Sequence, residues 1–431
     1  MSARRGGARR PMTVRTMNVQ TLGEARFPSR HRLGVGDDVR IPERIECGAE
    51  PGLAFEVAGP RARLFFDPPA TRAGIVTCGG LCPGINNVIR SLYLELHHGY
   101  GVAEVIGFRD GYQGLDPAAG REPVVFTRAF VHDIHRDGGT VLGTSRGPVD
   151  VGVAVDDLAR RKVDILFAIG GDGTQRGAAE IHEEARRRGL ALAVVGVPKT
   201  IDNDIPFVSR TFGYLTAVEE ASEVLACAHT EATSVPNGIS LVKLMGRHAG
   251  FITAGATIAS QDVNFALIPE VPFALGPFLA ALRERMLQRG HALIAVAEGA
   301  GQELLASAGP PGRDASGNVK LGDIGPLLRR RIEEFFAAEG MPVVVRYFDP
   351  SYQIRSVPVT CEDALLCDHY ARNAAHAALA GKTGMIIGFM HERFIHVPVG
   401  LLADRVKRLD PTGAGWRSVL AATGQPERFT A

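Results

Sequence analysis

The sequence predicts an α/β protein built on parallel strands. Two short apolar runs, residues 163–169 (VDILFAI) and 190–197 (LALAVVGV), are rich in β-branched residues and bounded by Gly or Pro, which is typical of buried parallel strands. Between them, the polar and alanine-rich stretch 174–189 predicts the crossover helix of a strand–helix–strand unit. At 431 residues the chain is too long for one small core, so two domains are expected.

Residues 1–70 form a predicted N-terminal extension that is rich in Arg, Gly and Pro and carries little periodicity. Two strand signals lie within it, near Phe55 (LAFEV) and near Phe65 (ARLFF). The opening segment MSARRGGARRPMTVR is basic but lacks an apolar stretch, so no secretory signal is expected. A disordered start is predicted there, with a nucleic-acid-binding tail as the alternative.

The overall composition is that of a globular protein of the cytoplasm. Because the net charge is only +1, bulk electrostatics favours neither nucleic acid nor a membrane as a partner. No apolar run approaches the length of a membrane-spanning helix. The six cysteines lack the spacing of a zinc site, although Cys78 and Cys82 flank a Gly-Gly turn. Buried, reduced thiols are therefore expected.

The first strong strand signal, residues 72–78, runs into the glycine-rich turn 79–87. Pro83 suits the first turn of the helix that follows. Apolar residues then recur at helical spacing, namely Ile85, Ile89, Leu92 and Leu96. Another strand is predicted at 102–108, followed by a turn and by the glycine-rich segment 135–148.

Strands and helices continue to alternate through the rest of the chain. Helices are predicted at residues 211–229, 276–290, 327–338 and 361–381, and strands at 239–245, 263–268, 291–297, 342–347 and, last, 385–390. A mobile loop is expected at 299–325, which is rich in Gly, Ser, Pro and Asp. The polar tail from about residue 401 contains one helix candidate, 401–409.

Two turns at predicted strand ends indicate phosphoryl transfer. The first is 170–174 (GGDGT) and the second is 200–204 (TIDND). Both open onto one crevice, because ligands bind beyond the carboxyl ends of parallel strands. Glycines let backbone N–H groups approach phosphate oxygens, and a carboxylate beside them suits Mg²⁺. A second aspartate is suited to taking a proton from a hydroxyl group.

Other strand ends carry weaker candidates, and their alternatives stay open. The glycine-rich turn before the first helix suits a nucleotide or phosphate, although any tight strand-to-helix turn needs glycine. Tyr112 suits stacking on a base and Arg146 suits a phosphate, with a surface turn and a solvated arginine as alternatives. Arg247 suits a phosphate through its planar fork, and His248 is either catalytic or a hydrogen-bonding residue at a helix start. Glu298 suits sugar hydroxyls.

Together these segments resemble the phosphofructokinase family, whose members phosphorylate fructose 6-phosphate at its 1-hydroxyl. The resemblance covers residues 71 to about 400 and rests on six motifs in the family's order: GGLCPGINNVIR, GFRDGYQGL, GGTVLGTSR, IGGDGT, PKTIDNDI and MGRHAGF. The strand end at Glu298 and the YQIR turn follow them. The N-terminal extension and the VTCGGLCPG form are similar to the longer-chain branch, which contains pyrophosphate-dependent enzymes and ATP-dependent plant and trypanosomatid enzymes.

The resemblance implies a phosphofructokinase-like fold of two lobes, each a parallel-rich sheet flanked by helices, after the extension 1–70. The nucleotide-binding lobe would comprise residues 71–212 and about 357–400. The sugar-phosphate-binding lobe would comprise 213–356 and about 401–431, because the family's chain crosses between the lobes more than once.

The resemblance also assigns roles to individual residues. Asp172 would hold Mg²⁺, and the nucleotide would contact Gly80, Tyr112, Arg146, Gly171, Asp172, Gly173 and Thr174. Asp202 would be the general base, with Thr200, Asp204 and Arg247 as the other catalytic residues. The sugar phosphate would contact Thr200, Ile201, Asp202, Met245, Gly246, Arg247, Glu298, Arg346, Tyr352, Gln353, Ile354 and Arg355.

One of these residues bears on assembly. Arg346 matches a family arginine that reaches in from a neighbouring subunit, which implies a homodimer or homotetramer with a shared active site. A second inter-subunit arginine of the short bacterial enzymes has no match, because residues 234–238 (SVPNG) occupy that region.

Two positions concern the phosphoryl donor. Gly173 leaves room for the α-phosphate of ATP, whereas an Asp at that position would fill the space and repel it. Lys199 is typical of pyrophosphate enzymes, but the plant and trypanosomatid ATP enzymes also pair it with the small glycine. Steric exclusion favours ATP, so the predicted function is that of a glycolytic ATP-dependent 6-phosphofructokinase. A pyrophosphate-dependent enzyme and a non-catalytic sugar-phosphate sensor are the alternatives.

Overall fold

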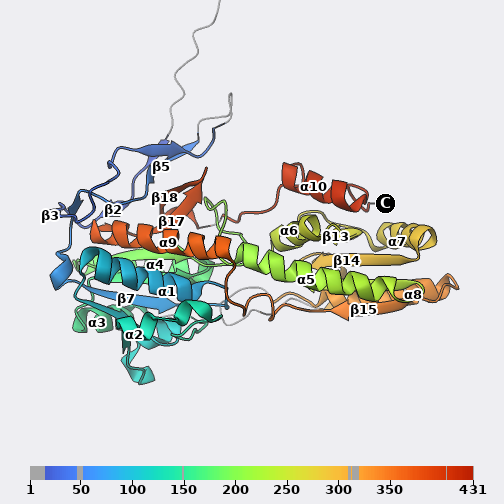
Figure 1. Cartoon of the computed structure of the whole chain (residues 1–431), viewed down its shortest axis with the longest axis horizontal. Helices are drawn as coiled ribbons and strands as arrows, with labels where there is room; N and C mark the ends of the chain where they lie inside the picture. Colours follow the sequence, from blue (N-terminus) through green and yellow to red (C-terminus); the bar gives the residue numbers. More distant parts are fainter. Residues whose placement is uncertain are drawn as a thin grey trace, which may run out of the picture.

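The computed structural model describes residues 15–45, 52–147, 150–308, 312, 320–403 and 405–430. Two sheets lie one beyond the other along the long axis of the molecule, each covered by helices (Figure 1). The large sheet has ten strands and the small sheet has four. Most neighbouring strands run parallel, which confirms the predicted α/β class with parallel-rich sheets.

The large sheet is centred on five parallel strands. Their order is β17 (Met385–Met390), β11 (Ala193–Pro198), β10 (Ile165–Gly170), β7 (Arg72–Thr77) and β8 (Glu104–Gly107). Successive side chains of a strand point to opposite faces, so Phe167 lies in the core that α1 and α9 cover while Leu166 lies in the core that α3 and α4 cover. The bounds of these helices are α1 (Ile85–Leu94), α3 (Val151–Arg160), α4 (Asp172–Arg187) and α9 (Cys361–Leu379).

The N-terminal extension is built into this lobe. Its strand β5 (Leu53–Val57) pairs with β18 (Arg393–Pro398) at one edge of the large sheet, next to β17, and β1 (Arg15–Met17) and β4 (Arg40–Pro42) pair with β5. At the other edge β9 (Val124–Val125) pairs with β8. Two small sheets join β2 (Gln20–Thr21) to β16 (Lys382–Thr383) and β3 (Phe27–Pro28) to β6 (Arg63–Leu64).

A buried charge cluster fixes the extension to the sheet. Glu56 of β5 lies 2.6 Å from Arg61, 3.0 Å from Lys382 and 3.2 Å from His396 of β18. Burial raises the pKa of Glu56, but hydrogen bonds from His396, Arg61 and Lys382 outweigh burial and hold it well below its ordinary value. The extension is therefore anchored by paired charges as well as by strand pairing.

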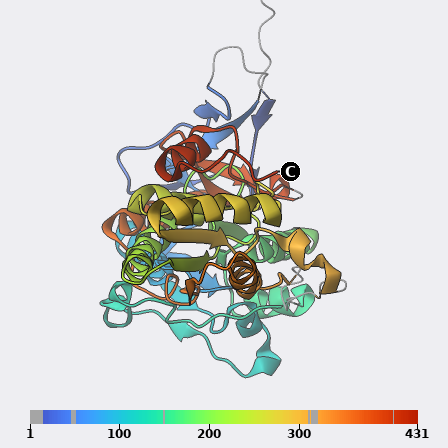
Figure 2. The same cartoon turned by 90° about the vertical axis from the view of Figure 1, so that its right-hand side faces the viewer.

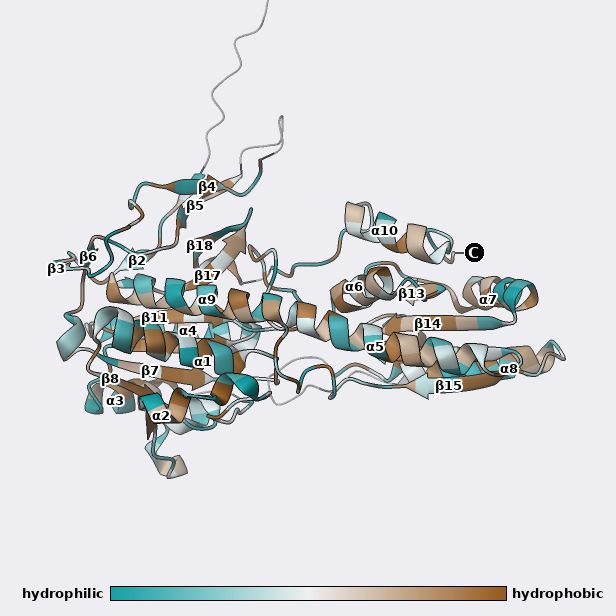
Figure 3. Ribbon diagram, viewed as in Figure 1, coloured by the Kyte–Doolittle hydropathy of each residue, from teal (hydrophilic) through white to brown (hydrophobic). Residues whose placement is uncertain are grey.

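The small sheet is wholly parallel, in the order β13 (Phe265–Leu267), β14 (His291–Ala297), β12 (Gly238–Leu244) and β15 (Val344–Phe348). Seen from its end, it lies between helices on both faces (Figure 2). Helices α6 (Phe251–Ser260) and α7 (Leu275–Arg289) cover one face, and α5 (Tyr214–Thr233) and α8 (Ile324–Ala338) cover the other. Apolar residues concentrate on the central strands of both lobes (Figure 3).

The remaining elements are short or terminal. Helix α10 (Ala414–Thr423) packs on α6 near the C-terminus (Figure 1). A π-helix, η2 (Glu95–Tyr100), continues α1, and α2 (Arg128–Val131) is a single turn. The 3₁₀ helices are η1 (Pro68–Ala70), η3 (Gly111–Leu115), η4 (Pro117–Ala119), η5 (Ile134–Arg136), η6 (Gln302–Ala308) and η7 (Val399–Leu401).

Two sequence predictions about the end of the chain are wrong. The strand at 385–390 is not the last, because β18 follows it after a turn at His391 and Glu392, which both adopt left-handed φ angles, of 49° and 58°. The predicted helix at 401–409 is absent from the described residues of that range: Leu401 ends η7, residues 402, 403 and 405–409 are not helical, and 404 lies outside the described residues. Instead the Glu270 carboxylate accepts a hydrogen bond from the Leu409 N–H, and the Asp204 carbonyl accepts one from the Lys407 N–H, which hold this segment extended.

Two further expectations need adjustment. Pro83 precedes the helix instead of beginning it, because Gly84, with a φ of 97°, is the N-cap of α1. In the predicted mobile loop 299–325, residues 302–308 form η6 and 320–325 are described, whereas 309–311 and 313–319 lie outside the described residues. No helix in the described part of the chain combines the length and the apolar character that crossing a membrane requires.

Candidate functional site

A cavity of about 710 Å³ opens between the two sheets, at the carboxyl ends of β7, β10, β11, β12 and β14. The structure brings most of the predicted site residues to its lining. They are Gly80, Tyr112, Arg146, Gly171, Asp172, Gly173, Thr174, Lys199, Thr200, Ile201, Asp202, Asp204, Met245, Arg247, Glu298 and Arg355.

The turn between β10 and α4 is closely packed at one glycine and open at another. A Cβ on Gly170 would lie 2.1 Å from Thr174 Oγ1, so only glycine fits there. A Cβ on Gly173 would meet nothing nearer than the flexible end of Arg176, at 3.8 Å. Asp172 is the first residue of α4, and its carboxylate is exposed and paired with Arg176 at 2.5 Å. The start of a sixteen-residue helix thus presents free N–H groups to the cavity.

Tyr112 is buried next to this turn and is hydrogen-bonded to it. Its ring is 6% exposed, and its hydroxyl donates a hydrogen bond to the Thr174 carbonyl, at 2.6 Å. A Cβ on Gly177 of α4 would lie only 2.7 Å from the ring. The alternative of a surface turn at Tyr112 is therefore wrong. Its contacts with Thr174 and Gly177 position the start of α4 relative to the sheet.

The turn after β11 carries two aspartates and is held by Asn203. Asn203 has a left-handed φ of 55°, and its side-chain oxygen accepts a hydrogen bond from the Thr211 N–H, at 3.1 Å. The Thr211 hydroxyl donates to the Thr200 carbonyl, at 2.7 Å, and the Asp202 N–H donates to the Thr200 hydroxyl, at 3.1 Å. This network leaves both carboxylates, of Asp202 and Asp204, facing the cavity.

The two carboxyl groups differ from free aspartates. Burial raises the pKa of Asp202 well above its ordinary value, and the carboxylates of Asp204 and Glu298 raise it further, against Arg247 and Lys199. Its Oδ1 is buried and has no hydrogen-bond partner among the described residues. Burial also raises the pKa of Asp204, and the charge of Asp172 acts in the same direction. Asp202 is thus a free acceptor with an enhanced affinity for protons.

Cationic groups gather at the first glycine-rich turn. The Lys199 ammonium, which is 5% exposed, donates to the Gly80 carbonyl at 2.5 Å, and burial lowers the pKa of this lysine. A Cβ on Gly80 would lie 3.4 Å from both the Arg146 and the Arg355 guanidinium groups. Arg146 is therefore aimed at the cavity as well as being exposed to solvent, and the convergent positive charge suits an anionic ligand.

The small sheet contributes a strained turn after β12. Gly246 and Arg247 have φ angles of 131° and 37°, and the Arg247 N–H donates to the Glu298 carboxylate, at 3.1 Å. Burial raises the pKa of Glu298, whereas the Arg247 N–H and the charge of Lys243 lower it. His248 also lines the cavity, and burial together with Arg247 lowers its pKa. Arginine, histidine and carboxylate groups thus face the aspartate turn across the cavity.

Five of the predicted residues do not line the cavity: Gly246, Arg346, Tyr352, Gln353 and Ile354. Ile354 is fully buried, and Tyr352 is 77% exposed, with the Arg355 guanidinium 4.8 Å from the centre of its ring. Arg346 lies on β15, an edge strand of the small sheet, 3.6 Å from Glu231 of α5, and its side chain is half exposed.

Comparison with known proteins agrees with this geometry. The family profile described as Phosphofructokinase matches residues 72–378. The chain belongs to the phosphofructokinase family.

Relatives and solved structures support this assignment. The ATP-dependent 6-phosphofructokinase of Amycolatopsis methanolica is 45% identical, over 96% of both chains. The ATP-dependent 6-phosphofructokinase of Trypanosoma cruzi is 48% identical, over 86% of this chain and 77% of that one. The crystal structure of the pyrophosphate-dependent phosphofructokinase from Marinobacter aquaeolei superposes with a TM-score of 0.68 at 19% identity, over 84% of this chain and 93% of that one, which bears on the fold alone. The resemblance to the phosphofructokinase family, including its trypanosomatid members, is thus confirmed.

Several lining residues were not predicted from the sequence. Leu402, Arg405 and Val406 reach the cavity from the segment after β18, and no motif in the polar tail signals them. Gln175 also lines it, and its buried side-chain amide donates to the Gly170 carbonyl, at 2.9 Å. Its position directly after the GGDGT turn was the only signal available.

The packing of the GGDGT turn predicts opposite results for two alanine substitutions. Gly170→Ala forces its Cβ into Thr174, so we expect the free energy of unfolding to fall by about 2 kcal/mol or more. Gly173→Ala adds a Cβ in open space at the start of a helix, so we expect a change within about 0.5 kcal/mol. Denaturant unfolding of both variants and the wild type measures this. Equal destabilisation by the two substitutions would contradict the description of the turn.

Proposed function

We propose that the chain is an ATP-dependent 6-phosphofructokinase, which transfers the γ-phosphate of ATP to the 1-hydroxyl of fructose 6-phosphate and yields fructose 1,6-bisphosphate. The observation that carries this proposal is the unpartnered Oδ1 of Asp202, which faces the same cavity as the GGDGT turn. A proton acceptor and a phosphate-binding helix start on one cavity are what phosphoryl transfer to a hydroxyl requires. The curated relatives at 45% and 48% identity, which are named as ATP-dependent enzymes, support the same function.

We place the nucleotide on the side of the cavity that the large sheet forms. We assign its phosphates to the N–H groups of residues 171–173 and to the guanidinium group of Arg146, with Gly80, Tyr112 and Thr174 beside them, since the Thr174 N–H donates to the Gly171 carbonyl. Residues 71–212 and about 357–400 would then be the nucleotide-binding lobe. Residues 213–356 and about 401–431 would be the sugar-phosphate-binding lobe.

Asp172 suits a divalent metal, for which we propose Mg²⁺. Its carboxylate is 60% exposed and lies close enough to Asp204 for its charge to raise the pKa of that residue. Two neighbouring carboxylates at a phosphate site are a favourable environment for a small dication. When bound, the metal would neutralise charge on the transferred phosphate.

The sugar phosphate belongs on the small-sheet side. We assign its phosphate to the guanidinium groups of Arg247 and Arg355 and its hydroxyls to Glu298, with Met245, Thr200 and Ile201 alongside. The backbone of Gly246 and the YQIR residues Tyr352, Gln353 and Ile354 support this side without lining the cavity. The sugar 1-hydroxyl would then face Asp202.

In the reaction Asp202 accepts the proton of the 1-hydroxyl while that oxygen attacks the γ-phosphorus. Thr200 and Asp204 hold the turn, and Arg247 and the N–H groups of α4 stabilise the charge that spreads over the phosphoryl oxygens. Because the pKa of Asp202 is raised, the base gains its proton, and activity is lost, as pH falls through a value above that of an ordinary aspartate.

Asp202→Ser removes the proton acceptor and tests this role. We expect turnover to fall about 100- to 10,000-fold with little change in the KM for fructose 6-phosphate. The wild-type kcat/KM should fall on the acid side, and the variant should lack this limb. Steady-state kinetics across pH measures both effects, and an unchanged turnover number would remove Asp202 from the role.

Two residues of the cavity, Gly173 and Lys199, bear on which phosphoryl donor binds. Gly173 opens into the cavity, whereas Lys199 is buried and bonded to the Gly80 carbonyl, so the size of residue 173 is the more direct control on what enters. The alternative is a pyrophosphate-dependent phosphotransferase, which Lys199 would favour.

Gly173→Asp adds a carboxylate where we expect the α-phosphate of ATP. Repulsion of like charges should lower kcat/KM for ATP roughly a hundredfold or more, and Gly173→Ala is the matched control. Initial rates with ATP and with pyrophosphate, at fixed fructose 6-phosphate, measure this effect. Retention of ATP activity by the Asp variant would contradict the steric account, and wild-type activity with pyrophosphate alone would establish the alternative.

Arg346 remains a proposal for the active site of a neighbouring subunit, in a homodimer or homotetramer. It does not line the cavity of its own chain, and its half-exposed side chain is accessible to a partner subunit. We expect Arg346→Ala to raise the KM for fructose 6-phosphate at least tenfold, with Glu231→Ala, which removes its ion-pair partner, as the control. Light scattering supplies the mass in solution, and a fully active monomer would contradict the proposal.

A further inference from the structure

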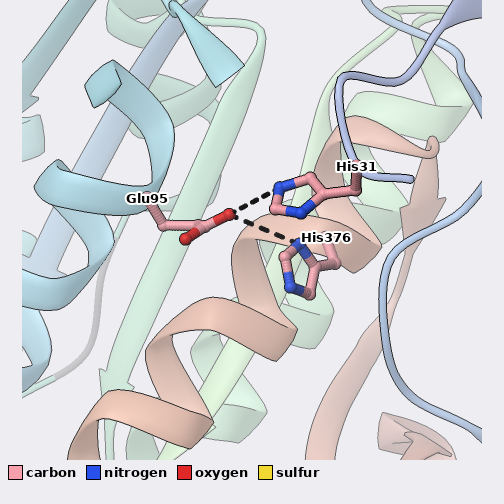
Figure 4. Close-up of side chains that lie close together, drawn as sticks. All are labelled: His31, Glu95 and His376. Atoms are coloured by element: carbon pink, nitrogen blue, oxygen red, sulfur yellow. Dashed lines mark ion pairs between the residues drawn. The ribbon is translucent and has the colours of Figure 1, made fainter. Parts of the chain in front are cut away.

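A second group of ligating side chains lies where the N-terminal extension meets two helices (Figure 4). His31 comes from the extension, Glu95 from η2 and His376 from α9. The distance from His31 Nε2 to Glu95 Oε1 is 2.8 Å, and His376 Nδ1 lies 3.8 Å from the same oxygen. The three ligand atoms all lie within 4.8 Å of one another.

Two of these atoms are buried and lie close together without a hydrogen bond. Neither His31 Nε2 nor Glu95 Oε1 makes a hydrogen bond within the described part of the chain, although both atoms are buried and close together. The Glu95 side chain is 2% exposed. A contact at 2.8 Å joins them without a hydrogen bond, and a metal ion between them would give both atoms a ligand.

The spacing of the cluster fits a metal ion. Three ligands of a tetrahedral Zn²⁺ ion, at about 2.1 Å from the metal, lie about 3.4 Å from one another. Two of the three separations, 2.8 Å and 3.8 Å, lie on either side of that value, and the third is at most 4.8 Å, so the side chains would have to draw closer around a metal. The Tyr100 hydroxyl is hydrogen-bonded to His376 Nδ1, at 2.8 Å; a metal ion on this nitrogen would replace that hydrogen bond, and the hydroxyl oxygen would be a fourth ligand.

The surroundings also suit a metal. Arg372 pairs with Glu95 Oε2, which orients the carboxylate and leaves Oε1 for a ligand.

We propose that His31, Glu95 and His376 form a binding site for a transition-metal dication, for which Zn²⁺ is the best fit. Two imidazole nitrogens and one carboxylate oxygen favour Zn²⁺ over Mg²⁺ and Ca²⁺, which prefer oxygen ligands alone. The ion joins the extension to α9 and η2. None of the three residues lines the cavity between the two sheets. The metal therefore stabilises the fold and does not enter the reaction.

The full-length chain, stripped of metal with a chelator, is titrated with Zn²⁺ against a competing chromophoric chelator. We expect one tightly bound Zn²⁺ per chain. His31→Asn and His376→Gln should weaken binding at least tenfold, because each removes one ligand. His98→Asn, which changes an exposed histidine on the same π-helix, is the matched control and should bind as the wild type does.

A second measurement separates loss of the metal from loss of the fold. Zn²⁺ should raise the Tm of the wild type and of His98→Asn, but not that of His31→Asn, because a ligand that binds only the folded state stabilises it. His31 is partly exposed, so its replacement leaves both helices intact. Absence of Zn²⁺ binding, or equal binding by wild type and His31→Asn, would overturn the proposal and identify the cluster as a metal-free ion pair or the bound metal as one held by surface histidines.

Discussion

Lys199 connects the three turns that form the large-sheet side of the cavity, through its ammonium group and through its backbone N–H. Its Nζ donates to the carbonyl of Gly80, after β7, and its backbone N–H donates to the carbonyl of Gly170, at the end of β10. Burial disfavours this charge, which lowers the pKa of Lys199, and the carboxylate of Asp202 acts in the opposite direction. The buried charge of Lys199 is costly, and the hydrogen bond from its ammonium group to the Gly80 carbonyl offsets part of that cost.

The same balance sets the properties of Asp202. Two cations, Arg247 and Lys199, favour its ionised form, while burial and the carboxylates of Asp204 and Glu298 favour the protonated form. Arg247 and Glu298 belong to the small sheet, whereas Lys199 and Asp204 belong to the large one. The affinity of Asp202 for protons therefore depends on both lobes being in place, so neither lobe alone provides the proposed base.

Most of the fold and much of the site could be predicted, because their signals are local. Strands 385–390 and 291–297 are continuous apolar runs with turn residues at their ends, and the structure keeps these bounds. The GGDGT and TIDND turns lie where parallel strands end, and that topology brings them together. Other features depend on partners far away in the sequence. Nothing local shows that Tyr112 donates to Thr174, or that β5 pairs with β18 some 340 residues later.

The segment after β18 shows most plainly why local signals fail. Its sequence favours a helix, but a long-range contact competes with helix formation. The Glu270 carboxylate accepts hydrogen bonds from the Leu409 N–H and from the Gly250 N–H, which precedes α6. Lys407 adds a second anchor, because its ammonium donates to the carbonyls of Val208 and Ser209. The segment gains side-chain bonds that a helix would not offer, and these outweigh its propensity.

This segment also links the cavity to both sheets. It leaves the large lobe beside α4, where Leu402, Arg405 and Val406 line the cavity, and it reaches α10 on the small lobe. Between these points its Lys407 N–H bonds to the carbonyl of Asp204. A displacement of one lobe relative to the other must therefore stretch a chain that is hydrogen-bonded to the aspartate turn itself. The position of Asp202 thus depends on the separation of the two halves of the cavity. The connection is made by the segment after β18, which carries no catalytic motif.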